Sequence, residues 1–345
     1  MEQTVFFSIR RIEVIAKETI FYELQPVGSE TFTYQAGQFL TFLFRHSKGE
    51  LRRSYSLCTY PEVDAYPAIL VKRIPNGEIS RHIQDYWKVG DVVESLPPSG
   101  RFVLEAAKRP RDLFLLAAGS GISPLMGLMK QVLHTEPETN VHLFYSNQNA
   151  EQTIFYQELK EEQQKHANRL HVELFLSESK YLERARLNRN LLEKLVDTRL
   201  QYAKEDAAFF VCGPYIYMQM VEIVLITLGF AKESIRKETF IIPKAAEPQF
   251  ELEDKSAKEV RLTFQGKTYD IVVPYPQNIL SVALEQGISL PYSCRAGRCS
   301  ACVAKCLEGK VAMSYNEVLT EKDEQRGYVL TCTGHPISQE VVLEF

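Results

Sequence analysis

Residues 291–302 have the sequence Pro-Tyr-Ser-Cys-Arg-Ala-Gly-Arg-Cys-Ser-Ala-Cys, and a further cysteine follows at position 332. The spacing is C-x4-C-x2-C with one distant partner, which is the spacing of the four thiolates that hold a [2Fe–2S] cluster. Ferric ions bridged by sulfide need soft anionic ligands, and thiolates are such ligands. Gly297 and its small neighbours let the backbone curl closely around sulfur. The expected ligands are Cys294, Cys299, Cys302 and Cys332.

A zinc site and two disulfides are the alternative interpretations of these cysteines. Zinc sites usually combine one C-x2-C pair with a second pair of Cys or His, and no second pair of this kind follows here. The chain has seven cysteines, an odd number of which four are assigned to the cluster, and this usage fits a reducing cytoplasm. Cys58 and Cys306 lie outside the spacing and are expected to be buried bystanders.

The segment around the cysteines has its own pattern of elements. Two apolar, β-branched runs at 260–264 and 267–273 precede a helix at about 278–286, and another short strand leads into Cys332. Residues 259–345 as a whole resemble a plant-type ferredoxin. The resemblance implies an α+β domain of the β-grasp type, with the cluster loop near the surface so that an electron can leave.

Length and charge limit what the whole chain can be. A chain of 345 residues is too long for one ordinary core, so two or three domains are expected. The net charge of −4 argues against nucleic acid and against an anionic membrane surface as partners. No apolar run approaches the roughly 18–20 residues of a membrane span. The first residues lack the order of a signal peptide, and we expect a cytoplasmic protein.

The first hundred residues alternate short strands with turns. Such a pattern predicts a small closed antiparallel β-barrel, interrupted by one short helix at about 80–86. The expected strands are Val5 to Ala16, Ile20 to Leu24, Phe39 to Phe44, Ser54 to Cys58, Ala68 to Arg73 and Val92 to Leu96.

From about residue 110 to 240 strands alternate with helices instead. Continuous apolar strands between helices predict a parallel sheet covered on both faces, which is a nucleotide-binding architecture by class. The expected strands are 112–118, 141–146, 170–177, 207–212 and 234–240, and the expected helices are 124–133, 154–166, 190–196 and 214–228. The polar, proline-bearing segment 243–258 is expected to be a flexible linker. The predicted domains are therefore 1–108, 109–242 and 259–345.

Two barrel segments carry residues suited to a flavin. They are Arg53, Ser54, Tyr55, Ser56, Val71, Lys72, Gly77 and Ser80. These segments resemble the R-x-Y-S and G-x-x-S elements of the ferredoxin–NADP⁺ reductase superfamily. The resemblance implies that Arg53 pairs with the flavin pyrophosphate, Tyr55 packs on the isoalloxazine and Ser56 lies near the ring nitrogen that takes hydride. The alternative is an ordinary strand with a surface arginine and a core tyrosine. The turn at 98–102 matches the family's barrel-closing turn and is expected to be structural.

Motifs at strand ends of the second region suit a nicotinamide nucleotide or the flavin that it reduces. Their residues are Gly119, Gly121, Ser123, Cys212, Gly213, Pro214, Glu238 and Phe240. The segment 119–124 departs from G-x-G-x-x-G because proline replaces the third glycine, but its glycines still let a pyrophosphate approach the backbone. In the superfamily the Cys-Gly-Pro lies beside the nicotinamide, and the E-x-F at 238–240 faces the flavin. The alternative is that Cys212 is only a small core residue and that Phe240 is only a core residue at a strand end.

Nucleotide preference depends on the end of the second strand. Relatives often carry Tyr-Gly-Asn-Arg there, whereas this chain has Tyr-Ser-Asn-Gln at 145–148, so a guanidinium for a 2′-phosphate is missing. Arg184, Arg186 and Arg189 could compensate, although such charges are usually only solvated. The pattern favours NADH slightly over NADPH.

The order barrel, nucleotide domain, ferredoxin resembles the reductase components of multicomponent oxygenases, a family that includes the reductase subunit of phenylacetyl-CoA epoxidase. The resemblance implies an NAD(P)H-dependent oxidoreductase that uses FAD, or less readily FMN, and passes single electrons through the cluster to a partner oxygenase. Because the cofactors perform the chemistry, no essential acid–base residue is expected. A stand-alone reductase for a desaturase, cytochrome or ferredoxin is an alternative. A redox-sensing or binding module with a structural cluster is another.

Overall fold

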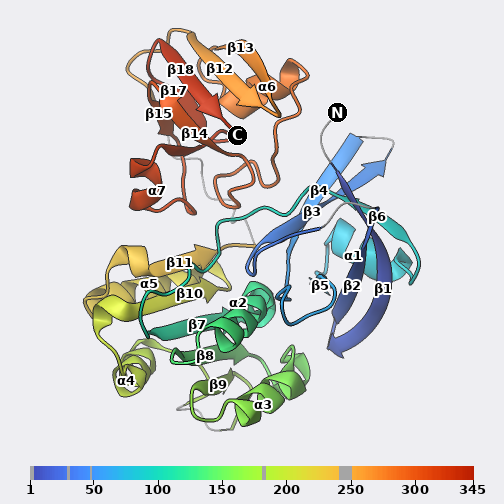
Figure 1. Ribbon diagram of the computed structural model, residues 1–345, viewed down its shortest axis with the longest axis vertical. Coiled ribbons are helices and arrows are strands. Elements are labelled where there is room, and N and C mark those ends of the chain that lie inside the picture. The colour runs from blue at the N-terminus through green and yellow to red at the C-terminus, as the bar shows by residue number, and fades with distance from the viewer. Residues whose placement is uncertain (1–3, 29–31, 47–48, 181–183, 241–250) are drawn as a thin grey trace. The chain divides into compact units, whose positions relative to one another are not determined.

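The computed structural model describes residues 4–28, 32–46, 49–180, 184–240 and 251–345. They form two units, one within 4–241 and one within 242–345, and each is described by itself (Figure 1). Of the predicted linker 243–258, residues 243–250 lie outside the described part of the chain. No helix among the described residues is both long enough and apolar enough to cross a bilayer.

An antiparallel sheet of six strands forms the first part of the larger unit, in the order β4-β3-β6-β1-β2-β5. A bridge between Leu57 and Ile69 joins the two ends of this order, so that the sheet closes on itself as predicted. Its core includes Phe7, Tyr22 and Phe42, and in β1 the buried Phe7 follows the exposed Phe6. The elements are β1 (Val5–Ala16), β2 (Thr19–Val27), β3 (Phe39–His46), β4 (Gly49–Ser56), β5 (Ala68–Lys72), α1 (Glu78–Tyr86) and β6 (Val92–Ser95).

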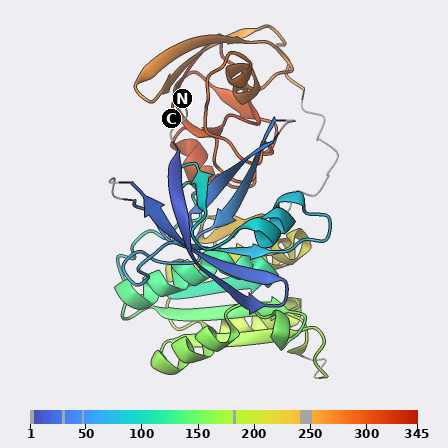
Figure 2. The same ribbon diagram turned by 90° about the vertical axis from the view of Figure 1, so that its right-hand side faces the viewer.

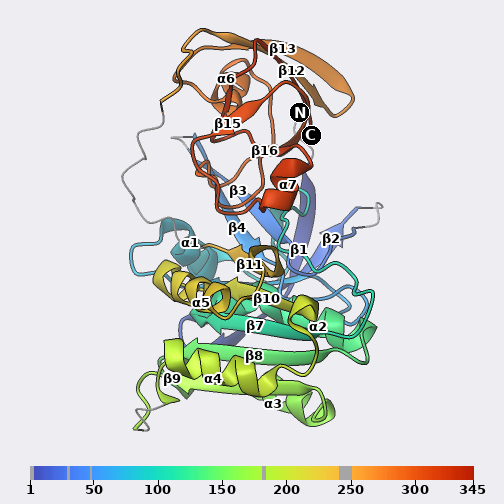
Figure 3. The same cartoon turned by 90° about the vertical axis from the view of Figure 1, so that its left-hand side faces the viewer.

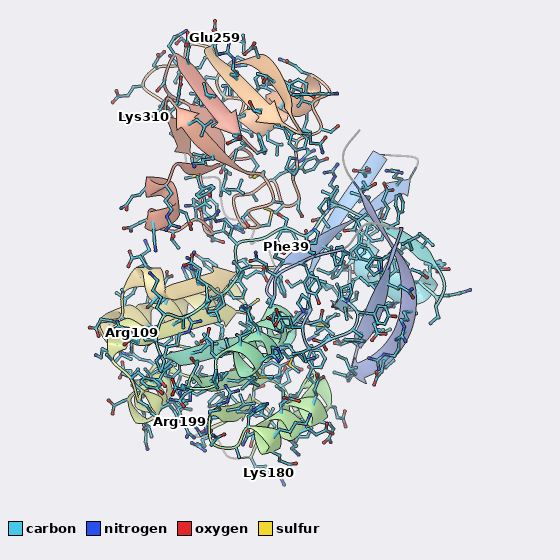
Figure 4. The ribbon with its side chains drawn as sticks, in the orientation of Figure 1. Phe39, Arg109, Lys180, Arg199, Glu259 and Lys310 are labelled. Atoms are coloured by element: carbon cyan, nitrogen blue, oxygen red, sulfur yellow. The ribbon has the colours of Figure 1, made fainter. Side chains whose placement is uncertain are left out.

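The turn at 98–102 closes this sheet against the start of β3. Phe39, labelled in Figure 4, exchanges two backbone hydrogen bonds with Ser99, of 2.8 and 3.0 Å. A Cβ on Gly100 would lie 3.0 Å from the Phe39 ring, and the glycine has a φ of +119°, so this position requires glycine.

A parallel sheet of five strands forms the second part of the larger unit and belongs to the green-to-yellow region of Figure 2. Its strands have the order β11-β10-β7-β8-β9. Strand β7 is buried along almost its whole length, as expected for a central strand covered on both faces. The elements are β7 (Asp112–Ala118), α2 (Ile122–Thr135), β8 (Asn140–Asn147), α3 (Tyr156–Lys165), β9 (Leu170–Leu176), α4 (Arg189–Arg199), β10 (Ala207–Cys212), α5 (Tyr215–Thr227) and β11 (Ile235–Glu238).

One face of the parallel sheet packs directly on the barrel. A single apolar cluster joins α2 residues such as Leu125 and Met129 to the barrel side chains Phe21 and Phe102. A Cβ on Gly127 would lie 2.8 Å from the Thr59 carbonyl oxygen, so α2 approaches the barrel backbone closely at its glycine. The opposite face of the sheet buries its own cluster under α4 and α5. The carboxyl ends of the strands therefore meet the barrel across one shared core.

The smaller unit is a mixed sheet with one main helix, as predicted for a β-grasp domain (Figure 3). The five strands of this sheet have the order β13-β12-β18-β14-β16, with β12 and β18 parallel and the other pairs antiparallel. A second, two-stranded sheet pairs β15 with β17 antiparallel. The elements are β12 (Lys258–Phe264), β13 (Lys267–Val273), α6 (Ile279–Glu285), β14 (Val303–Glu308), β15 (Val311–Met313), α7 (Glu321–Gln325), β16 (Tyr328–Leu330), β17 (Gly334–Pro336) and β18 (Glu340–Glu344).

Several element boundaries differ from the sequence-based expectation, and two of these lie in the barrel segments next to the site. Strand β4 spans Gly49–Ser56 rather than 54–58, because it pairs along its whole length with β3. Helix α1 begins at Glu78 with Gly77 as its N-cap, two residues before the expected start at Ser80. Strand pairing and helix capping depend on tertiary contacts, which the intrinsic propensities of the residues do not predict.

Candidate functional site

The four cysteines of the smaller unit come together from two segments. Cys294, Cys299 and Cys302 lie on the loop between α6 and β14, and Cys332 follows β16 directly. Cys302 and Cys332 are buried, whereas Cys294 and Cys299 are partly exposed. No disulfide joins any of the seven cysteines, all of which lie in the described ranges. Cys306 is half-buried and faces the carbonyl of Glu308 at 3.3 Å.

The four sulfur atoms interact with one another and with backbone N–H groups. The side chain of Cys294 hydrogen-bonds to those of Cys299 and Cys332, and Cys302 bonds to Cys332, so the pKa values of Cys294 and Cys302 fall and those of the other two rise. The N–H groups of Cys294, Ala296 and Gly297 donate to ligand sulfurs at 3.4 Å. Sulfurs facing a ring of donors form a cradle for an anionic sulfur-rich group.

The loop backbone adopts conformations that suit this cradle. Arg295, Gly297 and Ser300 have φ values of 53°, 69° and 53°. A Cβ on Gly297 would lie 2.5 Å from the Tyr315 carbonyl oxygen, so only glycine fits. Among the described residues no group of three or more His, Cys, Asp or Glu is placed to hold a single metal ion. The donor set of four thiols and several N–H groups fits a two-iron cluster, which spreads its ligands over two metals.

The larger unit contains a cavity of about 980 Å³ at the carboxyl ends of the parallel strands, next to β4 and β5. Four cations line it, and no carboxylate is among its described lining residues. A site of this size and charge suits a nucleotide with a pyrophosphate. The lining residues used below are Arg53, Ser54, Tyr55, Ser56, Lys72, Arg73, Gly119, Gly121, Ser123, Ser146, Asn147, Gln148, Arg186, Gly213, Pro214, Tyr217 and Phe240.

The end of β4 supplies one wall of the cavity. Arg53 is exposed, which leaves its guanidinium accessible from the cavity that it lines. Burial raises the pKa of the Tyr55 phenol, whose ring lies 6.2 Å from that of Phe42. Ser56 is buried and is held from both sides: its hydroxyl donates to Glu238 at 2.9 Å, and its carbonyl accepts from Ser123 at 2.9 Å.

Only part of the second predicted flavin segment, residues 71–80, lines the cavity, and the rest supports the cavity wall. Lys72 lines the cavity, whereas Val71 is fully buried in the barrel core. Gly77 and Ser80 are not among the lining residues; the Ser80 hydroxyl accepts from the N–H of Ile74 at 3.2 Å. Ser80 thus supports the turn at 74–75, which does line the cavity.

The glycine motif after β7 has two separate structural roles. Gly119 has a φ of +56° and its carbonyl accepts from the Tyr145 hydroxyl at 2.9 Å. A Cβ on Gly121 would lie 2.0 Å from the Cys212 carbonyl oxygen, so Gly121 allows two strand ends to pack together. A Cβ on Gly213 would likewise lie 2.9 Å from that of Ala118. These glycines bring the loops after β7 and β10 to the same point of the cavity.

Cys212 and Glu238 lie just behind this wall. Both are buried, and neither is among the residues that line the cavity. Burial raises the pKa of the Cys212 thiol, and burial raises the pKa of Glu238 to about 8 although the hydrogen bond from Ser56 acts in the opposite direction. Phe240 is 45% exposed and does line the cavity.

Part of the cavity wall carries three polar atoms whose contacts with neighbouring side chains do not have good hydrogen-bond geometry. Ser146 Oγ, Asn147 Nδ2 and Tyr217 Oη are buried and have no partner of good hydrogen-bond geometry among the described residues. Such orphaned groups are rare and fit a bound ligand that satisfies them. Of the three arginines considered from the sequence, Arg186 lines the cavity, whereas Arg184 contacts Glu173 at 3.7 Å and Arg189 pairs with Glu193 at 2.8 Å.

Sequence reasoning missed two parts of this cavity. Tyr217 lies in the first turn of α5, three residues after Pro214, and Phe175 and Ser177 lie at the end of β9. The general signal was present, because ligands of open α/β sheets bind at the carboxyl ends of strands and at the helix starts that follow them.

Fold and site together define a class of protein: a flavin- and nicotinamide-dependent reductase with an iron–sulfur domain. Residues 7–104 match the oxidoreductase FAD-binding domain, 115–223 the oxidoreductase NAD-binding domain and 262–336 the 2Fe-2S iron-sulfur cluster binding domain. FAD, NAD(P)H and a [2Fe–2S] cluster are therefore its cofactors.

Similarity extends over nearly the whole chain. One subunit of the 1,2-phenylacetyl-CoA epoxidase of Escherichia coli is 31% identical over 95% of this chain and 93% of its own length. The ferredoxin reductase component of the 3-ketosteroid-9-alpha-monooxygenase of Rhodococcus rhodochrous is 32% identical over 98% of this chain and 96% of its own length. The solved structure of phthalate dioxygenase reductase aligns with a TM-score of 0.61 and 25% identity, and the alignment covers 99% of this chain and 98% of that structure's chain. The chain belongs to the family of reductase components of multicomponent oxygenases, and it is an oxidoreductase.

Proposed function

We propose that this protein takes hydride from NADH or NADPH in the cavity of its larger unit and delivers single electrons from the cysteine loop of its smaller unit to an oxygenase. The observation that carries the proposal is the presence, in one chain, of two features. One is a cavity lined by four cations with no carboxylate among its described residues, and the other is a group of four sulfurs, three from one loop and the fourth from Cys332. When bound, FAD and the cluster supply the conversion of a two-electron hydride into single electrons.

Roles for the barrel residues follow from their positions. Arg53 and Lys72 bind the anionic part of FAD, since both are cations on the cavity wall. Arg73 contributes less because Asp85 already holds its guanidinium, at 2.7 and 3.2 Å. Tyr55 packs on the flavin ring, and Ser56 lines the cavity next to it while Glu238 holds the Ser56 hydroxyl. Val71, Gly77 and Ser80 support this wall from behind.

Roles for the nucleotide domain follow in the same way. Gly119, Gly213 and Pro214 border the entry of the nicotinamide nucleotide, while Cys212 and Glu238 sit behind the wall beside Ser56. The orphaned Ser146, Asn147 and Tyr217 atoms hydrogen-bond to the nucleotide. Arg186 is the one arginine of the three considered that stands in reach of a 2′-phosphate, which supports use of NADPH as well as NADH.

The acceptor is an oxygenase by the names of the relatives. Those names specify a phenylacetyl-CoA epoxidase and a ketosteroid monooxygenase. Their substrates differ, so the partner's substrate does not follow from them. A desaturase, a cytochrome or a separate ferredoxin is the alternative acceptor.

Three further statements stay predictions: the domain limits at about 108 and 242, the linker 243–258, and a cytoplasmic location. The location rests on the odd number of cysteines.

Anaerobic titration with NADH, and separately with NADPH, tests the proposal through the visible absorption spectrum. We expect both the flavin and the cluster bands to bleach, and the faster nucleotide to be the preferred one. Flavin bleaching beside an unchanged cluster band would favour the redox-sensing alternative. A purified protein that contained no flavin would contradict the proposal outright.

A further inference from the structure

The cluster loop contains a buried arginine. Arg298 lies between Gly297 and the ligand Cys299, and only 5% of its surface is exposed. Arginine is almost never fully buried unless it is paired, because removing its charge from water is costly. Its position inside the loop therefore requires a structural explanation.

Two side chains of a neighbouring segment hold the Arg298 guanidinium. Its Nη2 donates to the Tyr315 hydroxyl at 2.9 Å, its Nε lies 3.3 Å from Glu317 Oε2, and its Cζ lies 4.8 Å from the centre of the Tyr315 ring. The Tyr315 hydroxyl in turn donates to Glu317 Oε1. We call Arg298, Tyr315 and Glu317 the clamp. Within the described chain the Nε and Nη1 of Arg298 and the Oε2 of Glu317 have no hydrogen-bond partner, so Glu317 holds the guanidinium as an ion pair and Tyr315 holds it by a hydrogen bond.

Backbone contacts connect the clamp to the ligand cysteines. The Arg298 N–H hydrogen-bonds to Cys294, and the Gly297 N–H donates to Cys332 Sγ at 3.4 Å. The Glu317 N–H donates to the Gly297 carbonyl at 3.0 Å. The N–H groups of residues 297 and 298 thus bind ligand sulfur. The carbonyl of Gly297 and the guanidinium of Arg298 bind residues 314–317, which we call the clamp segment.

The clamp segment is also fixed on the side of the fourth ligand. The Thr333 hydroxyl, next to Cys332, donates to the Tyr315 carbonyl at 2.8 Å, and the Ser314 N–H donates to the Thr333 carbonyl at 2.8 Å. The segment therefore spans the loop that carries three cysteines and the strand end that carries the fourth.

We propose that Arg298 is a positioning residue that fastens the cluster loop to Tyr315 and Glu317 and thereby sets both the retention and the reduction potential of the cluster. The inference rests on the assignment of the cluster to the four cysteines. The groups that orient metal ligands govern metal affinity, and potentials depend on nearby charge and on hydrogen bonds to sulfur. Arg298 is buried and the Glu317 side chain is only 15% exposed, so this pair is screened less than surface charges.

A second arginine in the same loop provides a matched control. Arg295 lies between the same two ligands, Cys294 and Cys299, but it is exposed and stacks over Tyr292 with 4.2 Å between its Cζ and the ring centre. Arg295→Gln removes one positive charge from the loop, as Arg298→Gln does, without removing the clamp.

The test compares full-length holoprotein carrying Arg298→Gln, Arg298→Lys, Glu317→Gln, the double change Arg298→Gln/Glu317→Gln, and Arg295→Gln. Iron loss to excess chelator is followed by bleaching of the cluster band, and the midpoint potential by spectroelectrochemical titration. We expect Arg298→Gln to lose iron about 10-fold faster or more, the size typical of changes to groups that orient metal ligands. Arg298→Lys should recover part of the retention, and Arg295→Gln should match the wild type in retention.

The potentials provide a readout that a merely structural role would not produce. Arg298→Gln leaves Glu317 uncompensated and should lower the potential, Glu317→Gln leaves Arg298 uncompensated and should raise it, and the double change should lie between them. Equal iron retention and equal potentials across wild type, Arg298→Gln and Glu317→Gln would overturn the clamp, as would an Arg295→Gln variant with the same defects as Arg298→Gln.

Loss of folding does not remove the test. Should Arg298→Gln not fold, Arg298→Lys and Glu317→Gln decide by the same criteria. Failure of the clamp is distinct from failure of the proposed function: a wild-type protein without iron would remove both, whereas normal iron content with insensitive variants removes the clamp alone. Reduction of ferricyanide by NADH through the flavin serves as the internal reference for an intact larger unit.

Discussion

The cysteine loop and the nucleotide cavity are built in opposite ways. Three of the four sulfurs come from nine consecutive residues, and the fourth follows thirty positions later. The cavity takes its walls from segments spread from Arg53 to Phe240. A hydrogen bond behind its wall joins Ser56 and Glu238, which are 182 residues apart. The first site is local in sequence and the second depends on how the barrel and the parallel sheet pack.

This difference predicts how each site responds to change. A local site with covalent ligands should lose its cluster completely when one ligand is replaced, while the other site keeps its function. A cavity with many walls should lose affinity by degrees, since other lining residues remain. The three predictions that follow test this contrast, beginning with the largest effect.

Replacement of a cluster ligand is the most severe case. Cys299→Ser should abolish one-electron transfer to a protein acceptor because the cluster is lost or altered, while reduction of ferricyanide by NAD(P)H through the flavin stays within about twofold of wild type. Stopped-flow absorption and iron content measure the two halves separately. Cys306→Ser is the matched control, since Cys306 lies outside the spacing and its Sγ faces the carbonyls of Glu308 and Gly309. Loss of both activities in a folded Cys299→Ser protein would show that the units are not independent.

Removal of one cavity cation should have a graded effect. Arg53→Ala deletes a guanidinium on the cavity wall and should weaken FAD binding about 10- to 100-fold, as expected for one charge-assisted hydrogen bond. Flavin retention after dialysis, measured by fluorescence of the released FAD, reports the change. Arg45→Ala is the control, because Arg45 is an exposed barrel arginine that pairs with Glu50 and Glu94 instead. Unchanged FAD affinity in Arg53→Ala would refute the assigned role.

Sequence predicted the local site better than the distributed one. The approach of the cysteines follows from their spacing, and the three sheets follow from strand and helix periodicity. The sequence did not reveal that Gly121 is required by the Cys212 carbonyl, nor that Val71 lies in the barrel core. Both depend on which segments meet in three dimensions.

Arg298 illustrates the same limit within the local site. Its place in the loop was visible in the sequence, but its partners Tyr315 and Glu317 are separated from it by 17 or more residues. Nothing in the spacing distinguishes it from the exposed Arg295. The residues that bind a group are therefore more easily predicted than those that hold the binding residues in place.

The last prediction concerns stability rather than cofactor binding, and it depends on Glu238, whose burial raises its pKa from 4.5 to about 8. Between these two values the folded protein keeps a proton that the unfolded chain has released. The stabilisation is therefore fully present below about pH 4.5 and falls as the pH rises to about 8. Glu238→Gln is a neutral replacement that can still accept from Ser56. Its thermal midpoint should match the wild type near pH 5 and exceed it increasingly toward pH 8. Glu233→Gln, an exposed carboxylate just before the same strand, should follow the wild type throughout. Parallel curves for Glu238→Gln and wild type would mean that Glu238 is ionised in the folded protein and that the barrel and the parallel sheet share a buried charge at their junction.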